Sequence, residues 1–284
     1  MNVALDARYV REKPSGIGTY VQALLDRLPA LAPADRFLFW AHPLAPRPLS
    51  PAPNTSDRTV APGPNSPLPV WWPSRYGSFD GIDVFHSPHN MMPRALPCAS
   101  VVTVHDVMSI ERPDLHLQGL ERAVKGGYYK RAVWRALTEA TRIITPSQDV
   151  AERIGRLAPE AEGRVRVIHE AADPIFQPSR DPKGARAAAS VLIGSTAPYF
   201  LVVGANARTK RHADAVAAFA AVPEPWKLVL LQRQGAQRAL ASLAQSLGIA
   251  ERVVWIPRVT RQDVVTLIQS AGALVQPSLY EGFG

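Results

Sequence analysis

Short apolar runs alternate with stretches of helical periodicity along most of this chain, and that alternation constrains its fold more than any other feature. The runs are rich in β-branched residues and short enough to be buried strands, as at residues 100–104. Between them, apolar residues recur at the spacing of one helix face, as from Ile17 to Leu28. The pattern predicts an α/β protein with parallel, doubly wound sheets.

The predicted strands form two groups. The first group comprises residues 3–6, 37–40, 83–86, 100–106, 142–145 and 165–168, and the second comprises residues 199–203, 227–231, 253–256 and 273–276. Residues 43–73 contain ten prolines, too many for a helix or a central strand, so they are predicted to be one long irregular segment.

A polar, Pro-rich segment at residues 173–182 separates the two groups and has the composition of a linker. Pro182 suits the first position of a new helix. We therefore expect two Rossmann-like domains, residues 1–176 and residues 177–284. Such halves, with a cleft between them, would bind a ligand at the carboxyl ends of their strands.

Composition narrows the classes of function. The chain has 284 residues, 46% of them apolar, and a net charge of +8, which favours an anionic partner such as a nucleotide phosphate or an acidic membrane. No dense Lys/Arg block, aromatic stacking motif or helix-turn-helix pattern is present, so no nucleic-acid partner is expected. The single Cys98 excludes an intramolecular disulfide and a cysteine-based zinc cluster.

The amino-terminal residues resemble a strand rather than a signal peptide, and no apolar stretch is long enough to span a membrane. We therefore expect a cytoplasmic protein. A basic helix carrying aromatic residues is predicted over residues 118–140. It leaves open a peripheral association with the inner face of the plasma membrane, although covering the sheet is its simpler role.

Gly16 and Gly18 stand between the first predicted strand and the first predicted helix. A glycine-rich turn at a helix amino terminus can bind phosphate through free N–H groups and the helix dipole. A tight turn that requires positive φ explains the same glycines without any ligand. Both interpretations stay open from this turn alone.

His86, His89, His105 and Asp106 follow predicted strands and could suggest a metal site. We expect none, because Pro88 prevents a helix from holding His86 and His89 on one face. His105 could instead contact a ligand hydroxyl, with Asp106 or a backbone carbonyl fixing its tautomer, or it could be a buried histidine with satisfied hydrogen bonds.

The loop at residues 204–211 places Arg208 and Lys210 just before a predicted helix, a composition that suits a diphosphate. The chain closes on a short apolar run followed by Glu281-Gly282-Phe283-Gly284. Here glycines would let backbone N–H groups approach a ligand, and Glu281 could accept hydrogen bonds from sugar hydroxyls.

Taken together, five motifs resemble those of family 4 retaining glycosyltransferases, most closely the mannosyltransferase-like bacterial members. These motifs are Gly-Ile-Gly-Thr-Tyr at residues 16–20, Asp-Val-Phe-His-Ser-Pro-His at 83–89, Val-Thr-Val-His-Asp at 102–106, Val203-Gly204 with Lys210, and Glu-Gly-Phe-Gly at 281–284. The resemblance spans nearly the whole chain. It implies a GT-B fold and transfer of mannose or a similar hexose, with retention of configuration, from a GDP- or UDP-linked donor to a glycan, lipid-linked or small-molecule acceptor.

The resemblance also implies roles for individual residues. The amides of Gly16 and Gly18 would face the donor phosphate, and His105 would orient the sugar. Lys210 would bind the diphosphate and stabilise the departing charge. Glu281 would hold sugar hydroxyls together with the amides of Phe283 and Gly284. No metal and no dedicated protein base is expected, because the leaving phosphate helps to deprotonate the acceptor in this family.

Two departures from the family pattern matter. Ala205 stands where many relatives carry a phosphate-binding Arg, and Arg208 is the candidate substitute. The second Glu of the carboxyl-terminal motif would fall beyond Gly284, so we expect an incomplete second domain and little or no turnover from this polypeptide alone. The alternatives are another GT-B enzyme, such as a sugar-nucleotide epimerase or a phosphorylase, and a non-catalytic nucleotide-sugar-binding protein.

Overall fold

The computed structural model describes residues 1–12, 15–117, 119–232, 237–257 and 259–283. They divide into two compact units, one made of Met1–Glu170 with the chain end from Gly282, the other of Ala171–Glu281. We call them unit 1 and unit 2. Unit 2 begins at Ala171, ahead of the boundary expected near residue 176. The chain end from Gly282 belongs to unit 1, whereas we expected it in the second domain, residues 177–284.

Unit 1 is built on a seven-stranded sheet in the order β3-β2-β1-β4-β5-β6-β7, and every described pair of neighbours is parallel. The strands are β1 (Asn2–Asp6), β2 (Arg36–Ala41), β3 (Thr55–Thr59), β4 (Val84–Ser87), β5 (Ala99–Thr103), β6 (Arg142–Thr145) and β7 (Val165–Val167). Its helices are α1 (Gly16–Leu31), α2 (Pro67–Trp71), α3 (Met108–Glu111), α4 (Pro113–His116), α5 (Gly119–Glu139) and α6 (Gln148–Leu157), with 3-10 turns η1 (Pro73–Arg75) and η2 (Pro159–Arg164).

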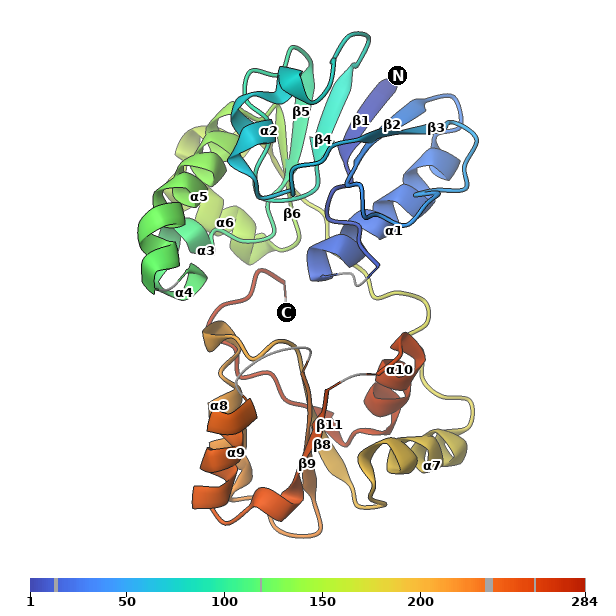
Figure 1. Cartoon of the computed structure of the whole chain (residues 1–284), viewed down its shortest axis with the longest axis vertical. Helices are drawn as coiled ribbons and strands as arrows, with labels where there is room; N and C mark the ends of the chain where they lie inside the picture. Colours follow the sequence, from blue (N-terminus) through green and yellow to red (C-terminus); the bar gives the residue numbers. More distant parts are fainter. Residues whose placement is uncertain (13–14, 118, 233–236, 258, 284) are drawn as a thin grey trace. The chain divides into compact units, whose positions relative to one another are not determined.

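Both faces of the unit 1 sheet are covered (Figure 1). Helix α1 packs Val21 and Leu25 against Leu5 and Phe37, while α5 and α6 pack against Val102 in a separate core. Alternate residues of a strand point to opposite faces of the sheet. The parallel register therefore places Val102 on the face opposite to that of Leu5. Unit 1 is therefore doubly wound, as predicted.

Unit 2 repeats this plan with a shorter sheet, in the order β10-β9-β8-β11, again parallel. Its strands are β8 (Tyr199–Val203), β9 (Lys227–Leu231), β10 (Val253–Ile256) and β11 (Ala273–Leu274). Its helices are α7 (Pro182–Ile193), α8 (His212–Phe219), α9 (Gln237–Ser246) and α10 (Arg261–Ser270), with 3-10 turns η3 (Arg208–Lys210) and η4 (Ala250–Arg252). One buried core lies under α8 and α9 and the other under α7 and α10.

The predicted helix starts follow the expected capping chemistry. Asp181 caps α7 ahead of Pro182, and Ser147 caps α6 by accepting the N–H of Val150. Thr260 and Asp263 form the reciprocal capping box at α10. The expected helix start at Pro182 is confirmed.

The prediction for residues 43–73 was wrong in part. Edge strand β3 occupies a proline-free stretch within them and pairs with β2 alone, so it needs no ladder on its second side. Helix α2 starts with Pro67 in its first turn, where a missing N–H costs no intrahelical bond, and Ser66 caps it. The last strand is also shorter than the predicted residues 273–276.

Candidate active site

His105 lies just past the carboxyl end of β5, and both nitrogens of its ring are engaged within unit 1. Nδ1 is 3.0 Å from Oε1 of Glu170, and Nε2 is 3.1 Å from the carbonyl oxygen of Pro88. The backbone N–H of His105 donates to Oδ1 of Asn90. The ring of Tyr20 packs edge-on against the imidazole, with 4.9 Å between the two ring centroids. These contacts fix the orientation of the ring.

Sequence reasoning missed Glu170. It follows β7 at the carboxyl edge of the sheet, the edge that also carries His105. An acid placed there after a strand could have been noticed, because neighbouring parallel strands present their carboxyl ends side by side. Asp106 does not contact the ring in any described hydrogen bond; its Oδ1 accepts the N–H of Met108.

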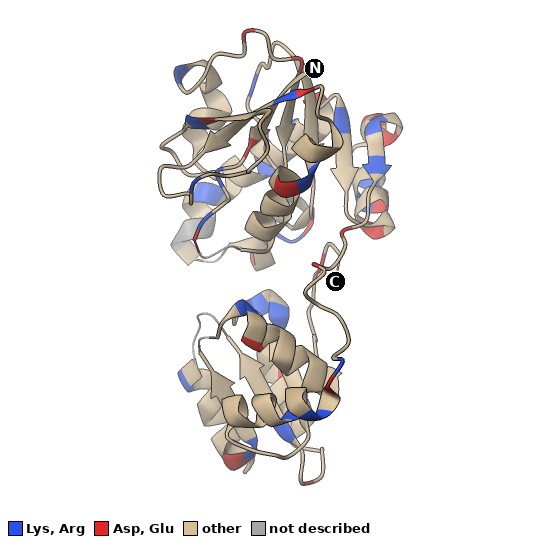
Figure 2. Cartoon of the chain, turned by 90° about the vertical axis from the view of Figure 1, so that its right-hand side faces the viewer, with Lys and Arg blue, Asp and Glu red and all other residues tan. Residues whose placement is uncertain are grey.

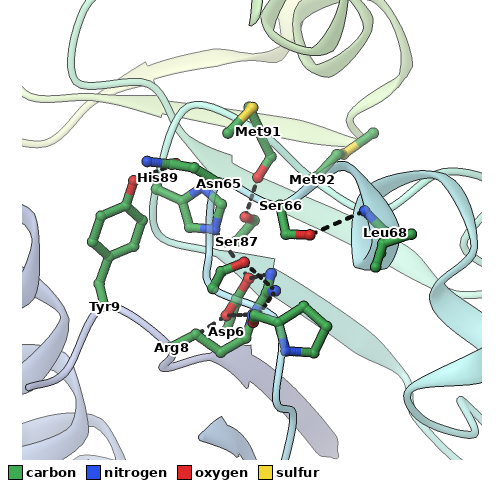
Figure 3. A network of polar contacts seen from close by, with 12 residues as sticks. Asp6, Arg8, Tyr9, Asn65, Ser66, Leu68, Ser87, His89, Met91 and Met92 are labelled. Carbon is green, nitrogen blue, oxygen red and sulfur yellow. Dashed lines mark hydrogen bonds and ion pairs between the residues drawn. The ribbon is translucent and has the colours of Figure 1, made fainter. Parts of the chain in front are cut away.

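A second group of charged residues lies at the end of β1, deep in unit 1 (Figure 3). The guanidinium of Arg8 donates to both oxygens of Asp6, at 2.8 and 2.6 Å. Nε2 of His89 is 3.0 Å from Oδ2 of the same carboxylate. Arg8 also donates to the carbonyl oxygens of Pro62 and Gly63, which ties the proline-rich segment to β1.

This buried group has a fixed charge state. Burial opposes ionisation of Asp6, but the adjacent charge and hydrogen bonds of Arg8, with the bond from His89, outweigh it and hold the pKa of Asp6 well below its usual range. Burial lowers the pKa of His89 despite its hydrogen bond to Asp6. The expected arrangement is therefore an ionised Asp6, a cationic Arg8 and a neutral His89.

The glycine turn begins α1 as predicted, but its amides are not all available. Ser15 is the helix cap, and its Oγ accepts the N–H of Gly18 at 3.1 Å. Neither Gly16 nor Gly18 has positive φ, so a tight turn of that kind does not explain them. A phosphate at this turn would contact the N–H of Gly16 directly and that of Gly18 only if Ser15 moved away.

In unit 2 the structure brings Lys210 and Glu281 together. Nζ of Lys210 is 2.6 Å from Oε1 of Glu281, and the amide of Gln276 donates to the same oxygen at 2.8 Å. The N–H of Leu279 donates to the carbonyl oxygen of Thr209, which joins the two segments. Burial raises the pKa of Glu281, but the hydrogen bond from Lys210 and its charge outweigh that effect and lower it overall.

The loop before Lys210 begins at Gly204, directly after β8. Gly204 has a φ of 131°, a conformation that side chains rarely adopt, so glycine is required for this turn. Arg208 follows in the 3-10 turn η3 and is exposed. Both predicted cations of this loop thus lie past the carboxyl end of β8.

The chain end packs against the His105 segment of unit 1. A Cβ on Gly282 would lie 1.8 Å from the carbonyl oxygen of His105, so only glycine permits this approach. Oγ of Ser147 donates to the carbonyl oxygen of Gly282 at 2.6 Å, and Phe283 lies 6.1 Å, ring to ring, from His169. Gly284, a predicted ligand of the donor, lies outside the described residues.

Neither metal clusters nor membrane spans occur in the part of the chain that the structure describes. No three His, Cys, Asp or Glu side chains within it are grouped so as to hold a metal ion. None of its helices is both long and apolar enough to cross a bilayer. Lys, Arg, Asp and Glu are interspersed in both units, as Figure 2 shows.

Two family profiles match the chain. The one described as Glycosyltransferase Family 4 matches residues 14–175, more than half of the chain, and the one described as Glycosyl transferases group 1 matches residues 186–284.

Among curated proteins, the chain is similar to D-inositol 3-phosphate glycosyltransferases. It is 32% identical to that of Mycobacterium sp. (strain JLS) over 155 residues, which make up 53% of this chain and 35% of the relative. It is 30% identical to that of Mycobacterium avium (strain 104) over 155 residues, 53% of this chain and 36% of the relative. The matches thus span about a third of the length of these relatives.

Solved structures share the fold at low identity. Sucrose-phosphate synthase from Thermosynechococcus elongatus matches with a TM-score of 0.70 and 19% identity, over 100% of this chain and 77% of that one. WaaG, a glycosyltransferase involved in lipopolysaccharide biosynthesis, matches with a TM-score of 0.75 and 18% identity, over 99% and 76%. HepE from Anabaena, in complex with UDP, gives 0.64 and 17%, over 100% and 76%.

These likenesses show the fold: parallel Rossmann-like sheets of the GT-B glycosyltransferase type, with the second sheet shorter. The Family 4 profile covers the glycine turn and the His105 segment of unit 1. This chain belongs to glycosyltransferase family 4.

Proposed function

We propose that this chain forms the donor and acceptor domains of a retaining hexosyltransferase. The donor is a hexose, mannose or a similar sugar, linked to GDP or UDP, and the acceptor is a hydroxyl group of a glycan, a lipid-linked sugar or a small molecule. The reaction needs no metal ion.

The ion pair between Lys210 and Glu281 supports this function most strongly. A nucleotide sugar carries a diphosphate, which needs a cation, next to a ring of hydroxyl groups, which need an acceptor. Unit 2 holds one of each, 2.6 Å apart, past the carboxyl ends of β8 and β11. In this position Lys210 would stabilise the charge that develops on the leaving diphosphate.

The pair is also accessible enough to exchange partners. The side chains of Lys210 and Glu281 are 32% and 30% exposed. Partly exposed ion pairs contribute only about 1 kcal/mol or less to stability, so a ligand can replace this one at a small cost. Arg208 would then supply the second cation, in place of the Arg that is absent at Ala205.

Unit 1 contributes His105 and the glycine turn. We propose that the N–H of Gly16 meets the donor phosphate and that His105, held by Glu170, contacts the sugar. The backbone of Gly282 and Phe283 would complete the contacts to the sugar together with Glu281. The leaving phosphate would accept the proton of the acceptor hydroxyl, so that no protein base is needed.

Calorimetric binding of UDP and GDP to the purified chain tests the donor site. A dissociation constant in the micromolar range is expected for one of them, unchanged by EDTA. NMR of the reaction product then tests retention of configuration. From a donor whose sugar is α-linked to the nucleotide that binds, an α-linked product is expected. Absence of binding by either nucleotide would refute the donor site, and a β-linked product would refute retention.

We further propose that the enzyme works at a membrane surface, with α5 facing the lipid headgroups. The outer side of this helix exposes Val124 and Trp134 beside Lys130 and Arg131. Sedimentation with vesicles of phosphatidylglycerol, but not of phosphatidylcholine, is expected. The Lys130→Glu, Arg131→Glu double variant should lose this binding, and equal sedimentation of the variant would contradict the role.

A further inference from the structure

A cavity of about 200 Å³ lies within unit 1, between the glycine turn, the segment after β4 and helix α5. Its polar lining includes Tyr9, Asn65, His89, Asp106, Ser109 and His116. Its volume is below the roughly 300–1,000 Å³ of sites for drug-sized ligands, so it has room for about one sugar-sized ring.

Ser109 presents a hydrogen-bonding group that unit 1 leaves unused. Its side chain is 5% exposed, lines the cavity, and has no hydrogen-bond partner for Oγ among the described residues. A buried hydroxyl without a partner destabilises the fold, because its hydrogen bonds to water are lost and not replaced. A bound hydroxyl group that reached Oγ would remove that penalty, so Ser109 is a contact for a polar ligand in our proposal.

His89 also lines the cavity, and one nitrogen of its ring is free to accept a hydrogen bond. Its Nε2 must carry the proton, because its partner Oδ2 of Asp6 belongs to an ionised carboxylate that can only accept. Burial keeps the ring neutral by lowering its pKa, so Nδ1 retains its lone pair. The described residues give the ring no other hydrogen-bond partner than Asp6, which leaves Nδ1 for a ligand hydroxyl.

The charges around the cavity disfavour an anion. Neither Lys nor Arg lines it in the described part of the chain; Asp106 does, as do the imidazoles of His89 and His116. The nearby guanidinium of Arg8 is committed to Asp6 and to the carbonyl oxygens of Pro62 and Gly63. A phosphate in the cavity would therefore lose its water without gaining the permanent cation of a Lys or Arg.

We propose that this cavity binds the terminal ring of an uncharged, hydroxyl-rich acceptor, a sugar or a cyclic polyol without phosphate, through Ser109, His89 and Asp106. This inference rests on the proposed transferase function, which it deepens by naming the acceptor class. It separates this chain from its curated relatives, whose name specifies an acceptor that carries a phosphate, D-inositol 3-phosphate.

Saturation-transfer NMR on the full chain, without donor, tests the site with two matched pairs of probes at millimolar concentration. The pairs are myo-inositol with D-inositol 3-phosphate, and methyl α-glucoside with glucose 6-phosphate. We expect at least one neutral probe to bind and its phosphorylated partner to bind at least about tenfold more weakly, because the phosphate meets Asp106 and neither Lys nor Arg.

Two variants locate the binding. Ser109→Ala removes a hydroxyl that has no partner, so the fold should keep its stability while the neutral probe binds about three- to tenfold more weakly. Tyr9→Phe removes the hydroxyl that holds Asn65 at 2.6 Å and should weaken binding by a similar factor. Ser74→Ala and Tyr76→Phe, which change residues outside this cavity, are the matched controls and should bind like the unmodified chain.

Tighter binding of the phosphorylated probes would overturn the inference, and so would neutral binding that Ser109→Ala leaves unchanged. If no neutral probe binds while UDP or GDP does, the cavity assignment is wrong and the proposed transferase function stands. If a neutral probe binds in a Ser109-dependent way while neither nucleotide binds, the cavity binds polyols as inferred and the donor assignment fails.

Discussion

The ion pair of Asp6 and Arg8 in unit 1 is buried, whereas the ion pair of Lys210 and Glu281 in unit 2 remains partly open to solvent. In unit 1, the paired side chains of Asp6 and Arg8 are 0% and 1% exposed. In unit 2, those of Lys210 and Glu281 are 32% and 30% exposed. Both pairs join opposite charges at almost the same distance, 2.6 Å.

The difference in burial implies different roles for the two ion pairs. A buried pair must stay intact, because either ion left alone in a low dielectric is expensive. A partly exposed pair is screened by water and adds little to stability. The Asp6–Arg8 pair is therefore expected to determine the shape of its surroundings, and the Lys210–Glu281 pair is expected to bind ligand.

Asp6→Asn should have the largest effect. It leaves the cation of Arg8 buried beside a neutral amide, and removing one partner of a buried pair costs about 3–5 kcal/mol. Urea denaturation at pH 7 measures the loss in the free energy of unfolding. The control is Asp57→Asn, which breaks a surface pair with Arg47 and should cost less than about 1 kcal/mol. Equal losses in the two variants would remove the distinction between buried and exposed pairs.

The second prediction concerns acid. Burial, with smaller contributions from the charges of His89 and His105, lowers the pKa of His86 to about 4. An unfolded histidine has a pKa of about 6.5, so between these values the unfolded chain binds a proton that the folded chain refuses. The free energy of unfolding should therefore fall as the pH falls from about 6.5 to about 4, by roughly 2–4 kcal/mol for this residue.

Denaturation at a series of pH values checks the prediction, with His86→Gln as the comparison. The variant loses the titrating group, and its amide can still bond to Oγ1 of Thr103, which lies 3.0 Å from Nε2 of His86. Its stability should depend less steeply on pH in this window. Asp6 does not interfere, because its own contribution is lost only below the unfolded pKa of about 4. The same slope in variant and parent would show that His86 is not the source.

Unlike Asp6→Asn, Lys210→Ala should have little effect on stability and a large effect on ligand affinity. Its free energy of unfolding should change by less than about 1 kcal/mol, while affinity for UDP or GDP should fall about 10- to 100-fold, the value of a charged hydrogen bond. Calorimetry measures the affinity. Lys227→Ala is the matched control, since this lysine lies at the opposite, amino end of a unit 2 strand. A stability loss as large as that of Asp6→Asn, with unchanged affinity, would assign Lys210 to structure instead.

The same difference explains what the sequence could predict. Strand and helix patterns depend on local periodicity, and they identified the strands of both parallel sheets except edge strand β3. The predicted strands Tyr199–Val203, Lys227–Leu231 and Val253–Ile256 agree with the structure at both ends. Motif residues in exposed loops, such as Lys210 and Glu281, could be named from their residue types and from family resemblance. Their pairing could not be inferred from the sequence, because it depends on how β8 and β11 neighbour each other.

The buried residues of unit 1 were harder to predict. Arg8 occurs two residues after Asp6, a spacing common in surface loops, and nothing local reveals that His89 completes the group from a position 83 residues beyond Asp6. The role of Ser15 was missed because the glycine turn suggested a ligand for its N–H groups. In the structure, the N–H of Gly18 is instead bonded to the helix cap, Oγ of Ser15. Edge strand β3 was missed because neighbouring prolines obscured a short proline-free stretch.

Gly282→Ala should have the smallest effect, and it tests whether the chain end behaves as a fixed part of unit 1. Its new Cβ would lie 1.8 Å from the carbonyl oxygen of His105, so one of the two segments must move. Moving the chain end forfeits the hydrogen bond from Ser147, about 1 kcal/mol, whereas moving the His105 segment would disturb the contacts of its ring with Glu170 and Pro88. We expect the chain end to move, because this costs less free energy. Gly163→Ala is the control, because its Cβ would meet nothing within 4 Å.

A double-mutant cycle with Ser147→Ala distinguishes the two outcomes. Ser147 also caps α6, so the single variant loses both the cap and the bond to Gly282. If Gly282→Ala detaches the chain end, Ser147→Ala in that background should cost only the cap, and the coupling energy should be about 1 kcal/mol. Additive losses, or a cost of 3 kcal/mol or more for Gly282→Ala, would mean that the chain end is held as firmly as the buried pair of Asp6 and Arg8.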